Sequence, residues 1–316
     1  MRSRTLGLLA AALMMATACG SGGTSTGGLT TVNVGVIAIV DCAPLYLGIQ
    51  QHFFQDQGLR LKPQLIQGGA AITAAVLSGN LQVGFSNNVS LIIASSKHLP
   101  VRIVAAGVQA GPRPDHDYVE LVVPSSSPIH SLADLEGKTV AVNNLDNIGP
   151  LSVNAALQKA GVDIAKVRYI EVSFPDMQAA LEGHRVDAAW VVEPFLSALE
   201  SAPGGVRVLS VTPAVVAPYF PISSYFVTLP YLQSHRDLVD RFVRAMNHSL
   251  QYAQTHPEAV RAVVPTYTKI PAEVAQRMTL PQWRTDIGAS LIRYQAQLAR
   301  QYGYIRQMPD WKTLLG

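Results

Sequence analysis

The stretch Gly68–Asn88, GGAAITAAVLSGNLQVGFSNN, is the most informative part of the chain. It predicts a helix that opens at two glycines, a tight turn at Gly79–Asn80 and a short strand with a polar end. Glycines carry no Cβ, so a ligand can approach the backbone at the start of the helix, where N–H groups are free. Polar groups at the carboxyl end of a strand form binding sites in α/β proteins. The predicted contacts here are Gly69, Ala70, Ser86 and Asn87.

A similar pattern occurs in Ser173–Glu193, SFPDMQAALEGHRVDAAWVVE. A polar loop again precedes a helix, a Leu-x-Gly turn and a strand with a polar end. Leu181-Glu182-Gly183 corresponds to Leu77-Ser78-Gly79 of the first stretch. Two such units about 100 residues apart predict two similar α/β lobes. The alternative is that helix, turn and strand simply recur in any α/β chain.

The N-terminus is typical of an export signal. Residues 1–18 combine a basic start, an apolar run and a small-residue cleavage site. Ala16-Thr17-Ala18-Cys19 resembles a bacterial lipobox, which predicts a lipid on Cys19; a plain secretory signal is the alternative. Residues 19–31, rich in Gly, Ser and Thr, then form a flexible tether. We therefore expect an exported domain that faces outside the cytoplasm and reaches the membrane only through its lipid.

Composition excludes some classes of protein. The 316 residues suffice for two α/β domains with their own cores. Cleavage before Cys19 removes Arg2 and Arg4 from the 24 Lys and Arg, which leaves 22 against 21 Asp and Glu. Such a neutral balance argues against a nucleic-acid partner. With Cys19 lipidated, Cys42 is the one remaining thiol, so no internal disulfide can form.

The chain that follows predicts alternating strands and helices. Val32–Ile39 is rich in β-branched residues and predicts a buried first strand. Asp41 follows it, and two roles stay open for this side chain: a helix N-cap and a ligand contact. Pro150 suits a first helical position, which would leave free N–H groups near Asn147.

Several sequence segments, in the order in which they occur along the chain, resemble a known family. SLADLEGKTVAV, LQKAGVD, AAWVVEPF and DCAPLYLGIQQHFFQDQGL are similar to the nitrate/sulfonate/taurine and thiamine-precursor branch of ABC-transporter substrate-binding proteins, and the likeness covers nearly all of residues 32–316. The resemblance implies a periplasmic-binding-protein type II fold, in which two hinged α/β lobes trap a ligand. It implies lobe one at 32–118 plus 226–316 and lobe two at 119–225, with an ABC permease and its ATPase as partners. No cofactor is implied.

The predicted ligand contacts lie in loops that would face the cleft. Glu193 ends an apolar strand; a ligand contact and an ion pair are both open for its carboxylate. Phe174, Tyr225 and Trp190 either stack on a flat ligand or pack in the core, with the core favoured for Trp190. Beyond the contacts of the first stretch, the predicted set is Asp41, Cys42, Asn143, Asn147, Ser173, Phe174, Glu193 and Tyr225.

The ligand class follows from charge. Free helix N-termini near Gly69 and Asn147 favour an anion such as an alkanesulfonate. The predicted cleft loops contain Asp41 and Glu193 but no Lys or Arg, which favours hydrogen-bond donors. We therefore expect a neutral or cationic nitrogen heterocycle, pyrimidine-like, or another aromatic compound, with an alkanesulfonate as the alternative.

Two other function classes are considered. The same fold serves some cytoplasmic enzymes, but no HExxH, His-x-His or Walker pattern occurs in this chain, and no Gly-x-Ser-x-Gly elbow joins a predicted strand to a helix, since the match at Gly23–Gly27 falls in the tether. No metal or catalytic site is therefore predicted. Unrecognised chemistry at Asp41, Cys42 or Glu193 would be the exception. A receptor domain that signals to a partner kinase fits the sequence as well as a transport component does.

Overall fold

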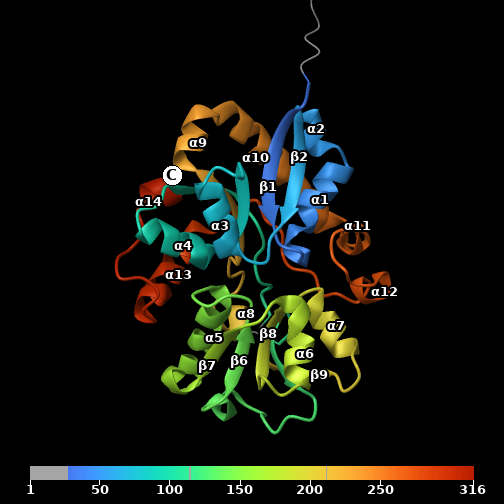
Figure 1. Ribbon diagram of the computed structural model, residues 1–316, viewed down its shortest axis with the longest axis vertical. Coiled ribbons are helices and arrows are strands. Elements are labelled where there is room, and N and C mark those ends of the chain that lie inside the picture. Colours follow the sequence, from blue (N-terminus) through green and yellow to red (C-terminus); the bar gives the residue numbers. More distant parts are fainter. Residues whose placement is uncertain (1–27, 114, 211) are drawn as a thin grey trace, which may run out of the picture.

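The computed structural model describes residues 28–113, 115–210 and 212–316, so the predicted signal peptide and Cys19 lie outside the described residues. Strands and helices form two bodies, an upper and a lower one in Figure 1, each built around its own sheet. Within the described ranges, no helix is both long enough and apolar enough to span a bilayer.

The first sheet has the strand order β2-β1-β3-β10-β4. Its first three strands are parallel, whereas β10 runs antiparallel to both of its neighbours. The inner strands are buried because both faces carry helices (Figure 1), as their apolar sequences require. The strands are β1 Thr30–Val36, β2 Leu59–Leu65, β3 Val83–Asn87, β4 Val101–Ala106 and β10 Ser223–Thr228.

The second sheet has the order β7-β6-β8-β5-β9. Here β6 is parallel to β7 and β8, and β5 is antiparallel to β8 and β9. The antiparallel strand therefore takes the fourth place in both sheets, and β3 and β8 both take the third. These two strands belong to the two similar sequence units. The units are therefore similar both in sequence and in the place that their strand takes in its sheet. The strands are β5 Val119–Pro124, β6 Thr139–Val142, β7 Arg168–Glu171, β8 Ala188–Val192 and β9 Val206–Ser210.

Helices cover both sheets. Those of the upper body are α1 Ala43–Gln50, α2 Phe53–Asp56, α3 Gly69–Leu77, α4 Asn88–Ser96, α9 Leu229–Ser234, α10 Arg236–Thr255, α11 Pro257–Val263, α12 Ala272–Ala275, α13 Ala289–Gln301 and α14 Trp311–Leu314. Those of the lower body are α5 Ile148–Lys159, α6 Met177–Glu182, α7 Phe195–Ser201 and α8 Thr212–Val216. Short 3-10 turns are η1 Val40–Cys42, η2 Leu132–Leu135, η3 Ile164–Lys166, η4 Phe174–Asp176 and η5 Val264–Thr266.

The long helix α10 shows how periodicity places an element. Phe242, Met246 and Leu250 recur every four residues and are all fully buried, so they share one face. That face packs on α1 and α2, where Phe54 meets the ring of Phe242. The C-terminal part of the chain therefore completes the upper body.

Some element boundaries differ from the sequence predictions. β1 begins at Thr30 and ends at Val36, so the sheet includes the last two residues of the predicted tether. Pro150 is the third residue of α5, not the first, because the Asn147 side chain caps the helix by accepting a hydrogen bond from the Gly149 amide at 2.8 Å. Further along the chain, His235 separates α9 from α10.

Candidate functional site

A small cavity lies between the two sheets. It has a volume of about 30 Å³, roughly the space that one water molecule takes in the liquid. Segments of the upper body form one wall, and β6, α5 and β8 form the other. A molecule held here would touch both bodies. The lining residues are Ile37, Ile39, Asp41, Phe85, Asn87, Asn143, Asn147, Ile148, Phe174, Trp190, Val192, Ile222 and Ser223.

Asp41 is the acidic group of this central cavity. It lies in η1, directly after β1, and only 2% of the residue is exposed. Its Oδ1 is buried and has no hydrogen-bond partner among the described residues. Burial raises the pKa of Asp41 to about 7; bonding to its own backbone and to Ser223 opposes the rise, and the charge of Asp117 adds to it. A ligand N–H group opposite Oδ1 would satisfy the oxygen and favour the charged carboxylate.

Three asparagines carry the amide groups of the cavity. Asn87 caps α4, with its Oδ1 accepting from the Ser90 amide at 2.9 Å. Asn147 caps α5, and its Nδ2 donates to Asn143 Oδ1 at 3.2 Å. The caps fix the first turns of both helices against the cavity. Asn143 also lines the cavity, and its amide nitrogen makes no hydrogen bond to a described residue.

Apolar side chains make up the rest of the cavity wall. Trp190 is 2% exposed, and its indole N–H donates to Thr212 Oγ1 at 3.1 Å, so the ring is fixed in place. Phe85 and Ile148 lie on opposite bodies. Sequence reasoning missed most of these residues because apolar side chains at strand ends are indistinguishable from core; the signal available was only their position next to polar loop residues.

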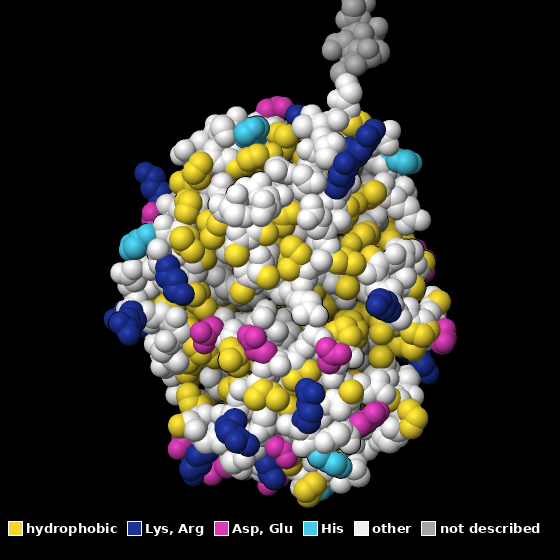
Figure 2. Space-filling view, in the orientation of Figure 1, with side chains coloured by type: hydrophobic (Ala, Val, Ile, Leu, Met, Phe, Trp, Pro, Cys, Tyr) yellow, Lys and Arg dark blue, Asp and Glu magenta, His cyan; other side chains and the backbone are white. Residues whose placement is uncertain are grey.

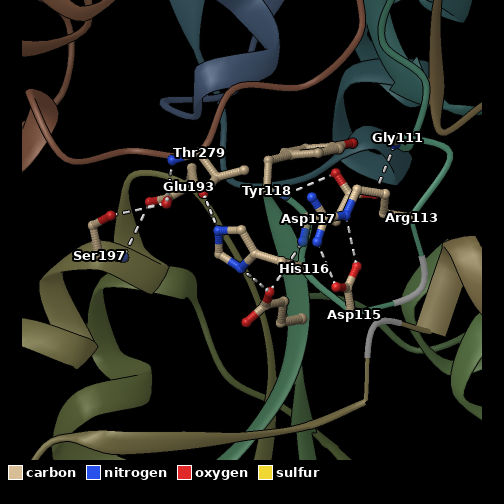
Figure 3. A network of polar contacts seen from close by, with 10 residues as sticks. Gly111, Arg113, Asp115, His116, Asp117, Tyr118, Glu193, Ser197 and Thr279 are labelled. Carbon is tan, nitrogen blue, oxygen red and sulfur yellow. Dashed lines mark hydrogen bonds and ion pairs between the residues drawn. The ribbon is translucent and has the colours of Figure 1, made fainter.

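Glu193 does not line the cavity but joins the two bodies (Figure 3). Its Oε2 accepts from the Ser197 amide at 3.0 Å, and its Oε1 accepts from the Ser197 hydroxyl at 2.8 Å and from the Thr279 amide at 3.0 Å. Thr279 belongs to the chain of the upper body, and its hydroxyl contacts His116 Nε2 at 2.6 Å. Burial raises the pKa of Glu193 to about 7, although these three hydrogen bonds lower it.

The same network continues into the connection between β4 and β5. His116 Nδ1 lies 2.9 Å from Glu120 Oε1, which also accepts from the Asp117 amide at 3.1 Å. Asp117 in turn accepts from the amides of Gly111 and Tyr118, both at 2.8 Å (Figure 3). One crossing of the chain between the bodies is thereby held in a fixed conformation.

Tyr225 and Cys42 lie behind the cavity wall. The Tyr225 ring packs edge-on against Phe85 at a centroid distance of 5.3 Å, and its hydroxyl has no partner among the described residues. Cys42 is fully buried, and burial raises the pKa of its thiol well above the usual value. Their predicted ligand contacts stay predictions.

The glycine pair before α3 packs against protein atoms. A Cβ on Gly68 would collide with the Asn144 side chain of the other body, and one on Gly69 would collide with Ser86 Oγ. Ser86 is fully buried with an unpaired hydroxyl, whereas Ala70 is exposed. Other atoms therefore do approach the backbone closely at both glycines, as the sequence predicts. In this structure these atoms belong to the side chains of Asn144 and Ser86, not to a ligand.

Ser173 borders a second cavity, and its hydroxyl donates to Asp176. This side cavity has a volume of about 140 Å³ and shares the walls Ile37 and Phe174 with the central one. On the face that Figure 2 draws, a row of acidic side chains crosses the middle of the molecule, with basic side chains to either side and below. The residues that the structure describes contain no group of three or more His, Cys, Asp or Glu placed to hold a metal ion.

Relatives of this chain include transport proteins. A Brachyspira hyodysenteriae protein, provisionally described as an ABC transporter periplasmic binding protein, is 24% identical over 275 residues, which span 84% of this chain and 78% of the relative. The taurine-binding periplasmic protein of Escherichia coli K12 is 28% identical over 148 residues, 47% of this chain and 44% of that protein.

Solved structures show the same fold. The alkanesulfonate-binding protein SsuA from Xanthomonas axonopodis pv. citri, bound to MOPS, matches with a TM-score of 0.76 at 17% identity, over 92% of this chain and 99% of that one. The nitrate-binding protein NrtA from Synechocystis PCC 6803 matches with a TM-score of 0.75 at 14% identity, over 90% and 84%. The predicted two-lobed periplasmic-binding-protein fold is confirmed.

A family model extends this likeness across most of the chain. It carries the description NMT1/THI5 like and matches residues 39–260, from the residue before η1 to α11. That range includes every lining residue of the central cavity except Ile37. The resemblance inferred from the sequence motifs is thus confirmed, and the chain belongs to the NMT1/THI5-like family.

Proposed function

We propose that this protein is the extracytoplasmic solute-binding component of an ABC importer, which captures a small organic molecule between two lobes. Support comes from the cavity, whose walls belong to both bodies, and from relatives described as periplasmic binding proteins. The lobes of this proposal are residues 32–118 plus 226–316 and residues 119–225, except that Ser223, Ser224 and Tyr225 go with the first lobe because they begin β10 of the first sheet. Because the central cavity has room for little more than water, the two bodies must move apart to admit a ligand and then close around it with a wider gap than in this structure.

The proposed ligand is a neutral or cationic nitrogen heterocycle, pyrimidine-like, or a related aromatic compound. The observation that carries this choice is the unpaired Oδ1 of Asp41 at the cavity wall. None of the described residues that line the cavity is Lys or Arg, so a sulfonate would meet a carboxyl group without a counter-charge. The aromatic rings of Phe85, Phe174 and Trp190 suit a flat ring.

An alkanesulfonate is the second candidate, because relatives are named for taurine and aliphatic sulfonates. The first turns of α4 and α5 border the cavity and would offer amide N–H groups to an anion. In this case Asp41 would have to bind as the neutral acid, with its O–H group donating a hydrogen bond to a sulfonate oxygen.

Export and anchoring complete the proposal. Residues 1–18 would direct secretion, a lipid on Cys19 would hold the protein at the outer face of the membrane, and a permease with its ATPase would receive the ligand. Mass spectrometry of the membrane-extracted protein tests the anchor: the N-terminal peptide should begin at a lipid-modified Cys19. A soluble mature protein with a free Cys19 thiol would contradict it.

Calorimetry of the tether-free domain separates the two ligand classes. We expect 4-aminopyrimidine and benzylamine to bind, and taurine and ethanesulfonate to bind at least tenfold more weakly. Asp41→Asn should weaken the amines by about tenfold or more, since an amide cannot provide the negative charge. Tight sulfonate binding that survives Asp41→Asn, with no binding of the heterocycle, would overturn the proposed ligand class.

A further inference from the structure

The side cavity next to the central one has a composition of its own. Its walls are largely apolar, with Ala38 and Leu65 on the upper body and Phe174, Pro175 and Phe195 on the lower one. Ser173 and Gln67 are its polar members. At about 140 Å³ it offers several times the room of the central cavity. It therefore suits an uncharged, apolar group that is larger than water.

Two residues are shared by the cavities. Ile37 and Phe174 line both, so the cavities adjoin at these two side chains. Phe174 lies nearly parallel to Phe195, with ring centroids 5.9 Å apart and an angle of 15° between the planes. The side cavity thus has an aromatic wall on the lower body that begins where the central cavity ends.

The mouth of the side cavity shows apolar surface to water. Leu65 at the end of β2 is 55% exposed, more than any other large hydrophobic residue among those described. Covering such a side chain is favourable, because apolar area is removed from water. The walls come from both bodies, so a group in this cavity would be enclosed in the same movement that encloses the central cavity.

From these observations we infer that the ligand has two parts: a small polar head in the central cavity and a compact apolar substituent in the side cavity. This inference rests on the proposed function and adds a substrate class to it, namely heads that carry an alkyl or aryl group. Polar selection falls to Asp41 and the asparagines, and selection for chain length falls to Ala38, Leu65 and Phe195.

A chain-length series tests the inference. Calorimetry of the tether-free domain would compare 4-aminopyrimidine with its 5-methyl to 5-hexyl derivatives, and methanesulfonate with the 1-alkanesulfonates up to hexyl. We expect affinity to rise about fourfold for each added methylene until the side cavity is full, and then to level off. The two heads make the test independent of which polar group the protein prefers.

Variants locate the effect. Ala38→Phe should fill the side cavity and abolish the gain with chain length, whereas the unsubstituted head keeps its affinity. Ala202→Phe is the matched control, because Ala202 is also half-buried and lines a groove elsewhere, on the far part of the lower body. Leu65→Gln, at an exposed position that folding tolerates, should reduce the gain in part. Circular dichroism would establish that each variant is folded.

The outcomes separate the inference from the proposed function. If the heads bind but chain length makes no difference, the side cavity is not a subsite and the inference is overturned alone. If only the sulfonates bind and their affinity rises with length, the heterocyclic head is wrong and the inference stands. Failure of both series to bind would overturn both proposals.

Discussion

Asp41 and Glu193 invite comparison because both are buried carboxyl groups that follow a strand, one in each body. Burial raises the pKa of each to about 7. Glu193 is held by three donors from Ser197 and Thr279, whereas Asp41 has an oxygen without a partner at a cavity wall. Burial alone therefore does not mark a binding residue. What separates the two is whether the protein itself provides the hydrogen bonds.

The largest expected effect is the loss of the Glu193 side chain. Glu193→Ala leaves three donors without their acceptor and should lower the free energy of unfolding by about 3 to 5 kcal/mol. Asp41→Ala should cost only about 1 kcal/mol, since its Oδ1 has no partner to lose. Urea denaturation measures both. Because burial penalises the two carboxylates to a similar extent, equal losses in the two variants would show that the hydrogen bonds of Glu193 contribute nothing.

The pH dependence of stability should be shared by both residues. Their pKa values rise from 3.8 and 4.5 to about 7 on folding, so the folded state holds more protons between these limits. The two carboxyl groups therefore contribute most to the free energy of unfolding below about pH 4. Their contribution is lost as the pH rises through 7. The loss is on the order of 1.4 kcal/mol for each unit of raised pKa.

Urea titrations at pH 5 and pH 8 check this expectation. The wild-type protein should lose stability over the interval, and Asp41→Ala and Glu193→Ala should each lose less. A variant whose two values differ as much as those of the wild type would mean that its carboxyl group titrates normally. That result would remove the residue from the comparison.

A smaller effect separates the donors of Glu193. Ser197→Ala removes the hydroxyl that donates to Oε1 but keeps the Ser197 amide, so the loss should be about 1 to 1.5 kcal/mol. Ser201→Ala is the control on the same helix, because its hydroxyl bonds to the Ser197 carbonyl near the surface. Equilibrium unfolding of both variants should show a near-zero change for the control. Two equal changes would assign the effect to helix propensity.

The smallest effect is expected at Cys42, next to Asp41 in the chain but outside the cavity. Cys42→Ala should keep the fold and cost at most about 1 kcal/mol, because a buried cysteine behaves as a small apolar group and alanine keeps the position apolar. The native thiol should resist labelling by an aromatic disulfide reagent until urea unfolds the protein. Rapid labelling of the folded protein would place Cys42 on an accessible surface.

Local patterns predicted the elements well. The helix predicted after Gly68 occupies Gly69–Leu77, and the strand predicted after the Gly79 turn is β3, because hydrophobic period and turn glycines act within a few residues. The start of α5 was predicted at Pro150 but lies at Ile148, since the Asn147 cap outweighs the proline preference. The first residue of a helix depends on which of several neighbouring residues has the strongest preference. The sequence alone does not show which preference is strongest.

The site was predictable only in outline. Asp41, Asn87, Asn143, Asn147 and Phe174 end or follow strands and do line the central cavity, while their contact with a ligand stays a prediction. Glu193 was indistinguishable from Asp41 in sequence, because its partner Thr279 is 86 residues away and becomes a neighbour only in the fold. The side cavity could not be foreseen either, since its walls come from short apolar stretches that read as core.

The place of β10 in the first sheet has a consequence for biogenesis. This strand lies between β3 and β4, yet Ser223 follows Ala106 by 117 positions. A chain that emerges from its N-terminus has delivered every strand of the second sheet by Ser210, while the first still lacks an inner strand and keeps two open edges. The inserted half can therefore mature first, and the enclosing half is completed only when translocation is nearly finished.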